Sequence, residues 1–428
     1  MRYKTPALAW AAFLMAAAAC AQQAGSAATG LSPLTLTEAV ALAEASNPAL
    51  RSKQAELAAA EGLKAEAAAL LFNNPEVTAL QTRRSLSAPA GNERWNEWNA
   101  GLSQKLELAG QQGHRRDAAA AGLDALRFEI ASLRRQVSAG VAERFYRVLA
   151  LQQRVDLEGQ ALRLFEDTAA AIQKRRAAGE DTRLDANVAV VEAERARNQL
   201  AIAQEQLLDA RNALATELQL PPSGLPRAVG DLALRARRYS LDDLLLLADA
   251  QPKLRALAAR ESSAGARLEL ERAAVYPDVT LGVYAGREGT GAARESLTTF
   301  TVSLPLPLFN RNDAGIGQAR ATLNQTQIER QAAARDARAS VNALWARLAS
   351  LESRVRRLQE SVLPALADNQ QLSLKSQRAG QIGLLELIVV NRQALDAQRD
   401  LIDALIDYHS TRAALELAAG WPAEGNPQ

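Results

Sequence analysis

The sequence has few of the residues on which disulfides, metal sites and bulky globular cores depend. Its 428 residues include one cysteine, two histidines, two methionines and 4% aromatic residues. A single cysteine cannot form a disulfide within the chain. The two histidines, His114 and His409, lie far apart in unlike contexts, so no metal site is predicted. The scarcity of Met and His also argues against a dedicated copper-shuttling surface.

The charge balance and the motif content exclude two further classes of function. The chain has 50 Lys and Arg against 48 Asp and Glu, which gives no general electrostatic reason to bind nucleic acid. It contains no phosphate-binding glycine loop, nucleophile elbow or pair of histidines at helical spacing. We therefore predict a protein that is not an enzyme and has no cofactor.

No apolar run is long enough for a membrane-spanning helix. The longest follows Arg2 and Lys4, spans about residues 7–19 and predicts an export signal over residues 1–20. Any membrane insertion would then have to use strands. Cys20 stands where a lipoprotein signal places its acylated residue, but ordinary cleavage near Ala21 fits the small residues equally well. Both alternatives stay open.

What the sequence does contain is an internal repeat with a spacing of roughly 200 residues. Four pairs of segments match in the same order: 47–51 with 251–255, 74–78 with 276–280, 103–108 with 303–308, and 176–179 with 377–380. Four collinear matches are unlikely to arise by chance. We predict two halves, 34–222 and 238–422, joined by a linker at 223–237 that follows the proline pair at 221–222.

The residue pattern of each half predicts an Ala-rich helix, two strands and then a long helix. Alternation of apolar and polar residues predicts strands at about 75–83, 96–108, 277–287 and 297–308. The stretches 114–176 and about 315–378 predict the long helices, because apolar residues recur there every three or four positions. About 60 helical residues would extend roughly 90 Å. Pro364 is expected to kink the second of these rods.

Helical patterns resume after a glycine in both halves, which predicts two long antiparallel helical hairpins. The predicted fold class is therefore mainly α with a small β part. Four strands per chain cannot close a barrel, and an open sheet edge in lipid is costly, so insertion would require several chains to share one barrel. The alternative is a periplasmic coiled-coil adaptor or scaffold whose short strands form a small sheet.

The repeated plan resembles the TolC-type outer membrane factor family over about residues 34–422. The segment SLPLPLFNRN at 303–312 resembles the strand-to-helix junction of its cobalt-zinc-cadmium branch. The resemblance implies a homotrimer with a twelve-stranded outer-membrane barrel and a periplasmic α-barrel, passive export of heavy-metal cations, a periplasmic adaptor and an inner-membrane RND pump. A drug or organic-compound channel of the same family is the alternative.

The resemblance also assigns residues at the hairpin tips. Gly179 and Gly380 map to the tip turns that contact the adaptor, beside Arg176 and Gln377. The family often has Tyr at these last two positions, so a tyrosine-based latch is in doubt. An acid follows each glycine six residues later. Asp185 and Glu386 are therefore candidates for carboxylates at the pore entrance. They fit equally well as ordinary acidic residues at a helix N-terminus.

A polar turn is expected where the last strand passes into the second long helix. Asn310, Arg311, Asn312 and Gly315 occupy this junction and are predicted to have a structural role. Trp95 and Trp98 would suit an aromatic girdle at a membrane surface or local loop packing. The predicted location is the outer membrane of a Gram-negative bacterium, with the helices extending into the periplasm.

Overall fold

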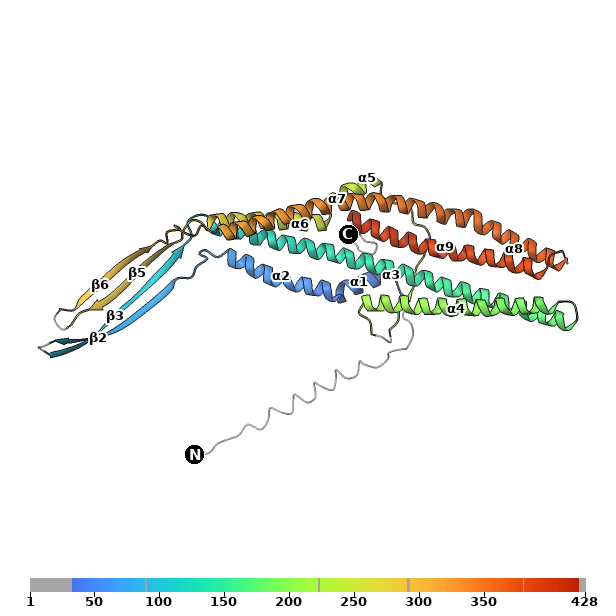
Figure 1. The fold of residues 1–428 in the computed structure, drawn as a ribbon, viewed down its shortest axis with the longest axis horizontal. Coiled ribbons are helices and arrows are strands. Elements are labelled where there is room, and N and C mark those ends of the chain that lie inside the picture. The colour runs from blue at the N-terminus through green and yellow to red at the C-terminus, as the bar shows by residue number, and fades with distance from the viewer. Residues whose placement is uncertain (1–32, 89–90, 222–223, 291–292, 380, 423–428) are drawn as a thin grey trace, which may run out of the picture.

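A computed structural model describes residues 33–88, 91–221, 224–290, 293–379 and 381–422. The molecule is elongated, with a four-stranded sheet at one end and two helical hairpins at the other (Figure 1). Cys20 and the predicted export signal at 1–20 lie outside the described residues, as does Gly380. The predicted fold class, mainly helical with a small β part, is confirmed.

The first half contains two short helices, two strands and two long helices. These are α1 Leu36–Ser46, α2 Pro48–Ala67, β2 Glu76–Ala88, β3 Gly91–Leu106, α3 Gln111–Ala177 and α4 Arg183–Glu217. The two-residue strands β1 Pro33–Leu34 and β4 Arg227–Ala228 pair in parallel beside them.

The second half follows the same series with one interruption. Its elements are α5 Leu241–Asp249, α6 Pro252–Ala273, β5 Val279–Glu288, β6 Glu295–Ser303, α7 Asp313–Arg357, the π-helix η2 Leu358–Val362, α8 Leu363–Arg378 and α9 Leu384–Ala419. Within the described residues, no helix is both long and apolar enough to cross a bilayer.

The first helix of each half is capped in the same way at its N-terminus. The side chains of Thr35 and Ser240 accept hydrogen bonds from the backbone N–H groups of Glu38 and Asp243, whose carboxylates accept from the cap N–H in return. This reciprocal capping satisfies N–H groups that a helix start leaves free. Pro48 and Pro252 then open α2 and α6, where the missing N–H of proline has no helical partner to lose.

Three predicted strand boundaries are wrong. The strands predicted at 75–83 and 96–108 leave the polar segment between them unpaired, but β2 and β3 pair through it as far as Ala88 and Gly91. Backbone hydrogen bonds hold an antiparallel ladder whatever the polarity of its side chains. The strand predicted at 297–308 ends at Ser303, because Pro305 and Pro307 cannot donate to a ladder.

The second rod changes its helical register just before Pro364. Residues Leu358–Val362 form a π-helix, and Pro364 is the second residue of α8. A proline ring displaces the carbonyl four residues back and removes one helical hydrogen bond, and a wider π turn absorbs both effects. At Arg163, its counterpart in the first half, α3 continues without a break.

The main hydrophobic core lies midway along the helices. It forms around Val141, Phe145 and Leu149 of α3, and α1, α4 and α9 contribute Val40, Leu214 and Leu405. The predicted apolar seam of the second rod is buried at Val341, Leu348, Leu351 and Val355, but Leu358 and Val362 are only half-buried. Packing therefore weakens where the π-helix begins.

Candidate functional site

The sheet has one face that is mostly apolar and one that is mostly polar. Its order is β2-β3-β5-β6, with every neighbouring pair antiparallel. One register row brings together Val77, Leu102, Val283 and Phe300, and all four side chains are exposed. Rows on either side add further apolar residues to the same face: Leu281, Val302, Ala79, Ala100, Ala285 and Trp98. We call this set the apolar face.

The opposite face, the polar face, carries small and hydroxyl side chains. One of its rows consists of Thr78, Gly101, Tyr284 and Thr299. The Tyr284 ring lies against Gly101, where a Cβ would stand 2.2 Å from the ring. Only glycine leaves room for the ring here. Leu80 and Leu297 interrupt this polarity on the two outer strands.

The two outer strands, β2 and β6, each have an edge that pairs with no described strand of this chain. Such an edge presents a row of free N–H and C=O groups that can bind another strand. The exposed fraction of Val77 on β2 is 79% and that of Phe300 on β6 is 77%. A single chain thus leaves open both the apolar face and the two edges of its sheet.

At the opposite end of the molecule, α3 and α4 meet in a tight turn. The N–H of Gly179 donates to the carbonyl of Arg176 (3.0 Å) and the N–H of Glu180 to that of Arg175 (2.9 Å), which is the Schellman arrangement. Gly179 has φ +82°, a conformation that glycine adopts without strain. In the second hairpin the N–H of Gln381 makes the corresponding bond to Ser376 (2.8 Å).

Asp185 and Glu386 both occupy the first turn of a tip helix. The Oδ2 atom of Asp185 accepts from the hydroxyl of Thr182 at 2.6 Å, and Oε2 of Glu386 accepts from the N–H of Gly383 at 3.1 Å. Each carboxylate therefore caps its helix through one oxygen. Glu386 is exposed and Asp185 half-buried. The capping interpretation explains their geometry, and a role at a pore entrance stays a prediction.

Two further acids, which were not among the residues predicted from the sequence, lie at the first tip. Arg175 reaches across the turn to Glu180 at 3.4 Å and to Asp181 at 3.3 Å. Arg176 is exposed and Gln377 half-buried. Both acids follow Gly179 directly, so proximity to the predicted turn was the available signal. The tip thus holds more carboxylates than the single Asp185.

Ion pairs with buried carboxylates join the two helical hairpins, away from the tips. Glu158 of α3 is fully buried and accepts hydrogen bonds from Arg154 at 2.9 Å and from Arg399 of α9 at 2.6 Å. The hydrogen bond to Glu158 raises the pKa of Arg399. Glu192 of α4 accepts two hydrogen bonds from Arg392 of α9. Carboxylates of the first half therefore bind arginines of the second.

The strand-to-helix junction is a turn that side-chain hydrogen bonds hold in place. Asn312, with φ +58°, precedes α7, and its amide donates to the Glu271 carboxylate at 2.6 Å. The Asn310 side chain accepts from the N–H of Asn312 at 3.0 Å, while Arg311 is exposed. A Cβ on Gly315 would lie 2.4 Å from the Glu271 carboxylate. Asn312 supplies the left-handed residue, and Gly315 supplies space.

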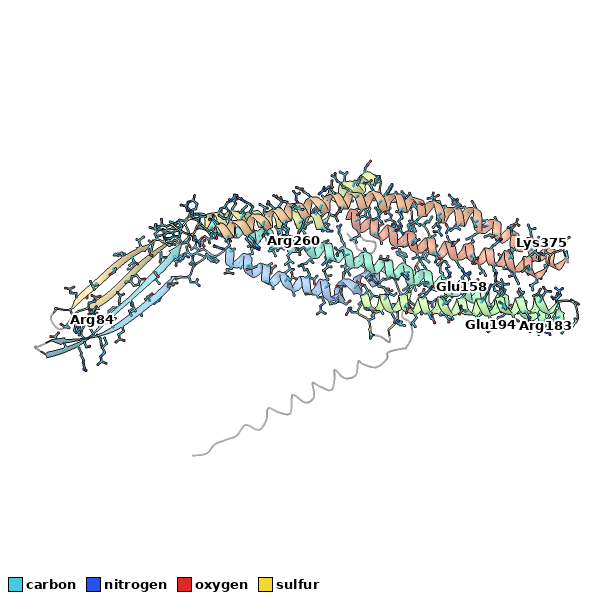
Figure 2. All side chains as sticks on the ribbon, viewed as in Figure 1. Arg84, Glu158, Arg183, Glu194, Arg260 and Lys375 are labelled. Atoms are coloured by element: carbon cyan, nitrogen blue, oxygen red, sulfur yellow. The ribbon has the colours of Figure 1, made fainter. Side chains whose placement is uncertain are left out.

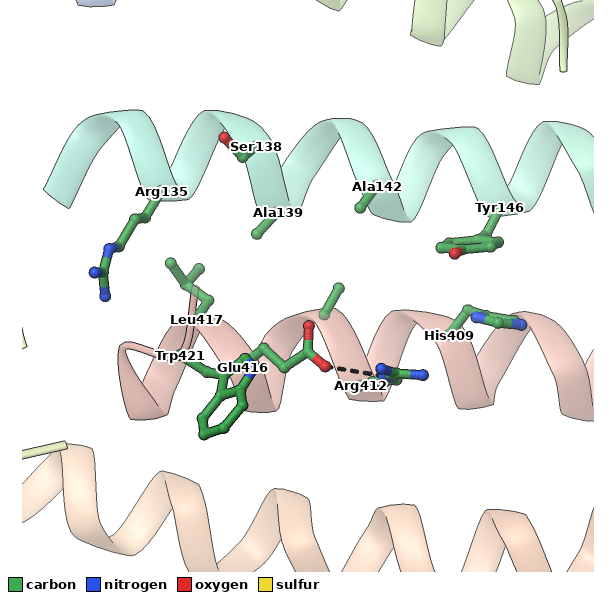
Figure 3. A pocket seen from close by; sticks show the side chains of 11 residues that line it. Arg135, Ser138, Ala139, Ala142, Tyr146, His409, Arg412, Glu416, Leu417 and Trp421 are labelled. Atoms are coloured by element: carbon green, nitrogen blue, oxygen red, sulfur yellow. Dashed lines mark hydrogen bonds and ion pairs between the residues drawn. The ribbon is translucent and has the colours of Figure 1, made fainter. Parts of the chain in front are cut away.

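A small cavity lies between α3 and α9 and is lined by Tyr146, His409, Arg412 and Glu416 among others (Figure 3). Its volume is about 30 Å³, which is room for one or two waters. His409 stacks on Tyr146 with ring centroids 3.9 Å apart. In the described part of the chain, no three His, Cys, Asp or Glu side chains are grouped to hold a metal ion.

The family model for outer membrane efflux proteins matches residues 39–218 and 246–421. The chain belongs to the outer membrane efflux protein family. The predicted resemblance and the predicted outer-membrane location are thereby confirmed, and its role is that of an efflux channel. Acylation of Cys20 stays a prediction.

Among characterised proteins, the chain is similar to the cobalt-zinc-cadmium resistance protein CzcC of Cupriavidus metallidurans. The two are 29% identical over 382 residues, which cover 88% of this chain and 86% of CzcC. It is 26% identical to the pyoverdine export outer membrane protein OpmQ of Pseudomonas putida, over 86% and 83% of the two chains. The fold matches the outer-membrane channel OprN with a TM-score of 0.76 and 19% identity, over 90% of each chain.

Proposed function

We propose that three copies of this chain close into one twelve-stranded barrel and form a passive conduit through the outer membrane. The observation that carries the proposal is the four-stranded sheet with an apolar face, a polar face and two free edges. Pairing β6 of one copy with β2 of the next would satisfy both edges. The apolar face would then contact lipid and the polar face would line water.

The helical hairpins would continue the conduit into the periplasm. Gly179, Gly380, Arg176 and Gln377 would contact a periplasmic adaptor, and an inner-membrane RND pump would supply the energy. Three copies would place several carboxylates around the entrance, including Asp185 and Glu386. A ring of carboxylates concentrates cations at a narrow opening. No catalytic step is required of this chain.

Divalent heavy-metal cations are the cargo that we propose. Similarity to CzcC over most of both chains supports this class, as does the junction segment at 303–312. OpmQ, at 26% identity, favours an organic substrate instead. A conduit leaves most of the selection to its pump, so both substrate classes need testing.

The assembly is tested by purifying the full-length protein in detergent. We expect a trimeric mass and discrete conductance steps in planar bilayers. A monomer that opens no conductance would overturn the proposal and favour a helical adaptor or scaffold. Family membership already favours the channel over that alternative.

The cargo is tested by deleting the gene and challenging the strain with zinc, cobalt, cadmium, nickel and hydrophobic drugs in parallel. We expect sensitivity to the metals, restored by a plasmid copy of the gene. Sensitivity to drugs alone would overturn the metal assignment and leave the conduit intact.

A further inference from the structure

A hollow lies between the far ends of the two β-hairpins, at the end of the sheet that points away from the helices. Its volume is about 950 Å³, and Arg83, Arg94, Arg294, Glu93, Trp95 and Thr290 are among the residues that line it. The neighbouring Arg84 marks this end of the sheet in Figure 2. This region is distinct from the ion pairs that join the two helical hairpins and from the capped tips of those hairpins.

The register places this hollow where the apolar face ends. Leu281 and Trp98 lie on the apolar face, and Trp98 pairs with Arg287, six residues beyond Leu281 on β5. Six residues span roughly 20 Å along a strand. Arg83 lies in the next row of the same face, opposite Asn96. The apolar band of outer-membrane barrels is about 25 Å tall, so the arginines begin near its outer limit.

The charges in the hollow are unbalanced. Three arginines face one carboxylate, that of Glu93. Arg84 forms an ion pair with Glu97 at 2.8 Å, whereas no described side chain pairs with Arg83, Arg94 or Arg294. Arg83 and Arg94 are diagonal neighbours across the β2-β3 ladder, because Arg83 pairs with Asn96 and Arg94 with Ser85. Long side chains can reach each other at such positions, so the two like charges repel and a bound anion would offset the repulsion. The planar fork of guanidinium groups binds phosphate oxygens in pairs.

We propose that Arg83, Arg94 and Arg294 bind the phosphate-bearing headgroup of a lipid at the outer surface of the membrane. The proposal rests on the proposed function, in which the apolar face contacts lipid. A lipid is favoured over free phosphate because Arg83 and Arg94 lie on the apolar face, one and two register rows beyond Trp98. With its headgroup in the hollow, the acyl chains of such a lipid would lie along the rows that contain Ala79 and Val77.

The experiment measures lipid binding to the detergent-purified full-length protein by native mass spectrometry. The probes are a diphosphorylated lipid A, phosphatidylcholine and inorganic phosphate. The test variant combines Arg83→Gln, Arg94→Gln and Arg294→Gln. Its matched control combines Arg320→Gln, Arg347→Gln and Arg356→Gln, which removes the same charge from exposed positions on α7.

We expect the test variant to bind diphosphorylated lipid A at least about tenfold more weakly, since three charge-assisted contacts are lost. The control should bind like the wild type. A second variant with Lys at the three positions keeps the charge and should lose only part of the affinity. Equal binding by the wild type and the test variant would overturn the proposal. Competition by inorganic phosphate at equal concentration would overturn it in favour of a free-anion site.

Conductance of the same preparations in bilayers of neutral lipid separates this proposal from the proposed function. Channels that open normally while the test variant fails to bind lipid A support both proposals. Channels that never open, in the wild type as in the variants, count against the conduit whatever the binding result.

Discussion

The two long hairpins follow one plan but differ in how firmly they are held. Over its last turns α3 buries Ala161, Phe165, Ala169 and Ile172 against α4 and α9. No described residue of α8, the corresponding stretch of the second hairpin, is buried. A π-helix separates α8 from α7, whereas α3 runs for 67 residues without a break.

This difference indicates that the two hairpins differ in local stability. Segments with few buried apolar contacts open locally at low free energy, and buried ones open only on global unfolding. We therefore expect the first hairpin to be the more stable of the two and α8 to open at a lower free energy. The two hairpins are joined chiefly through α9, which packs on α3 and binds Glu158 and Glu192 through its arginines.

The largest effect is expected from Glu158→Ala, which removes the carboxylate between Arg154 and Arg399. Two arginines would then remain half-buried without their common partner. Breaking a buried ion pair on one side costs about 3 to 5 kcal/mol, and the partial exposure of both arginines reduces this to roughly 2 to 4 kcal/mol. Denaturant unfolding of the full-length protein measures the loss.

Glu194→Ala is the matched control. Its side chain is 60% exposed and its partner Arg197 is exposed too, so the change should cost less than about 0.5 kcal/mol. Figure 2 shows Glu194 on the same hairpin, nearer the tip than Glu158. If both substitutions destabilise the protein equally, the ion pairs of Glu158 do not hold the two hairpins together.

Pro364→Ala should make the second rod more like the first. Restoring an N–H at this position permits continuous α-helix where Leu358–Val362 is now a π-helix. We expect α8 to gain about 1 to 2 kcal/mol of local stability and its amides to exchange more slowly. Hydrogen exchange with peptide-level mass spectrometry reports on α8 and α3 together. Unchanged exchange in α8 would show that proline is not what loosens it.

The tip caps offer a smaller and reciprocal change. Thr182→Ala removes the hydroxyl that caps α4 and should cost about 1 kcal/mol in local helix stability. Gly383→Ser adds a capping hydroxyl to α9 and should gain a few tenths of a kcal/mol. Amide exchange in the first turn of each helix measures both effects. Opposite signs are required, since one tip loses the cap that the other acquires.

The smallest effect is expected from acid, and it should be the same in both halves. Hydrogen bonds from Thr35 lower the pKa of Glu38, and those from Ser240 lower the pKa of Asp243. A carboxylate with a lowered folded pKa stabilises the protein above its unfolded pKa, and this contribution is lost as pH falls through the folded pKa. Amide exchange in α1 and α5 should therefore accelerate together below about pH 4. Acceleration in one helix alone would contradict equivalent caps.

Periodicity predicted the repeated elements because helices and strands of this length leave long patterns. Val341, Leu348 and Val355 are buried as their spacing required. The predicted end of β6 was wrong because the apolar run that predicted the strand included the prolines at 305 and 307. The ion pair between Glu158 and Arg399 could not be predicted, since its partners lie 241 positions apart and resemble the many solvated charges of these helices. Pairing at long range depends on packing that no local pattern encodes.

The strand order has a consequence for symmetry. Its inner seam joins β3 of the first half to β5 of the second, with Leu102 opposite Val283. In the proposed ring, the seam between copies would join β6 of the second half to β2 of the first. First and second halves would then alternate around the wall. Three chains would present six near-equivalent sectors, and any property that differs between the halves would occur three times at intervals of one third of the circumference.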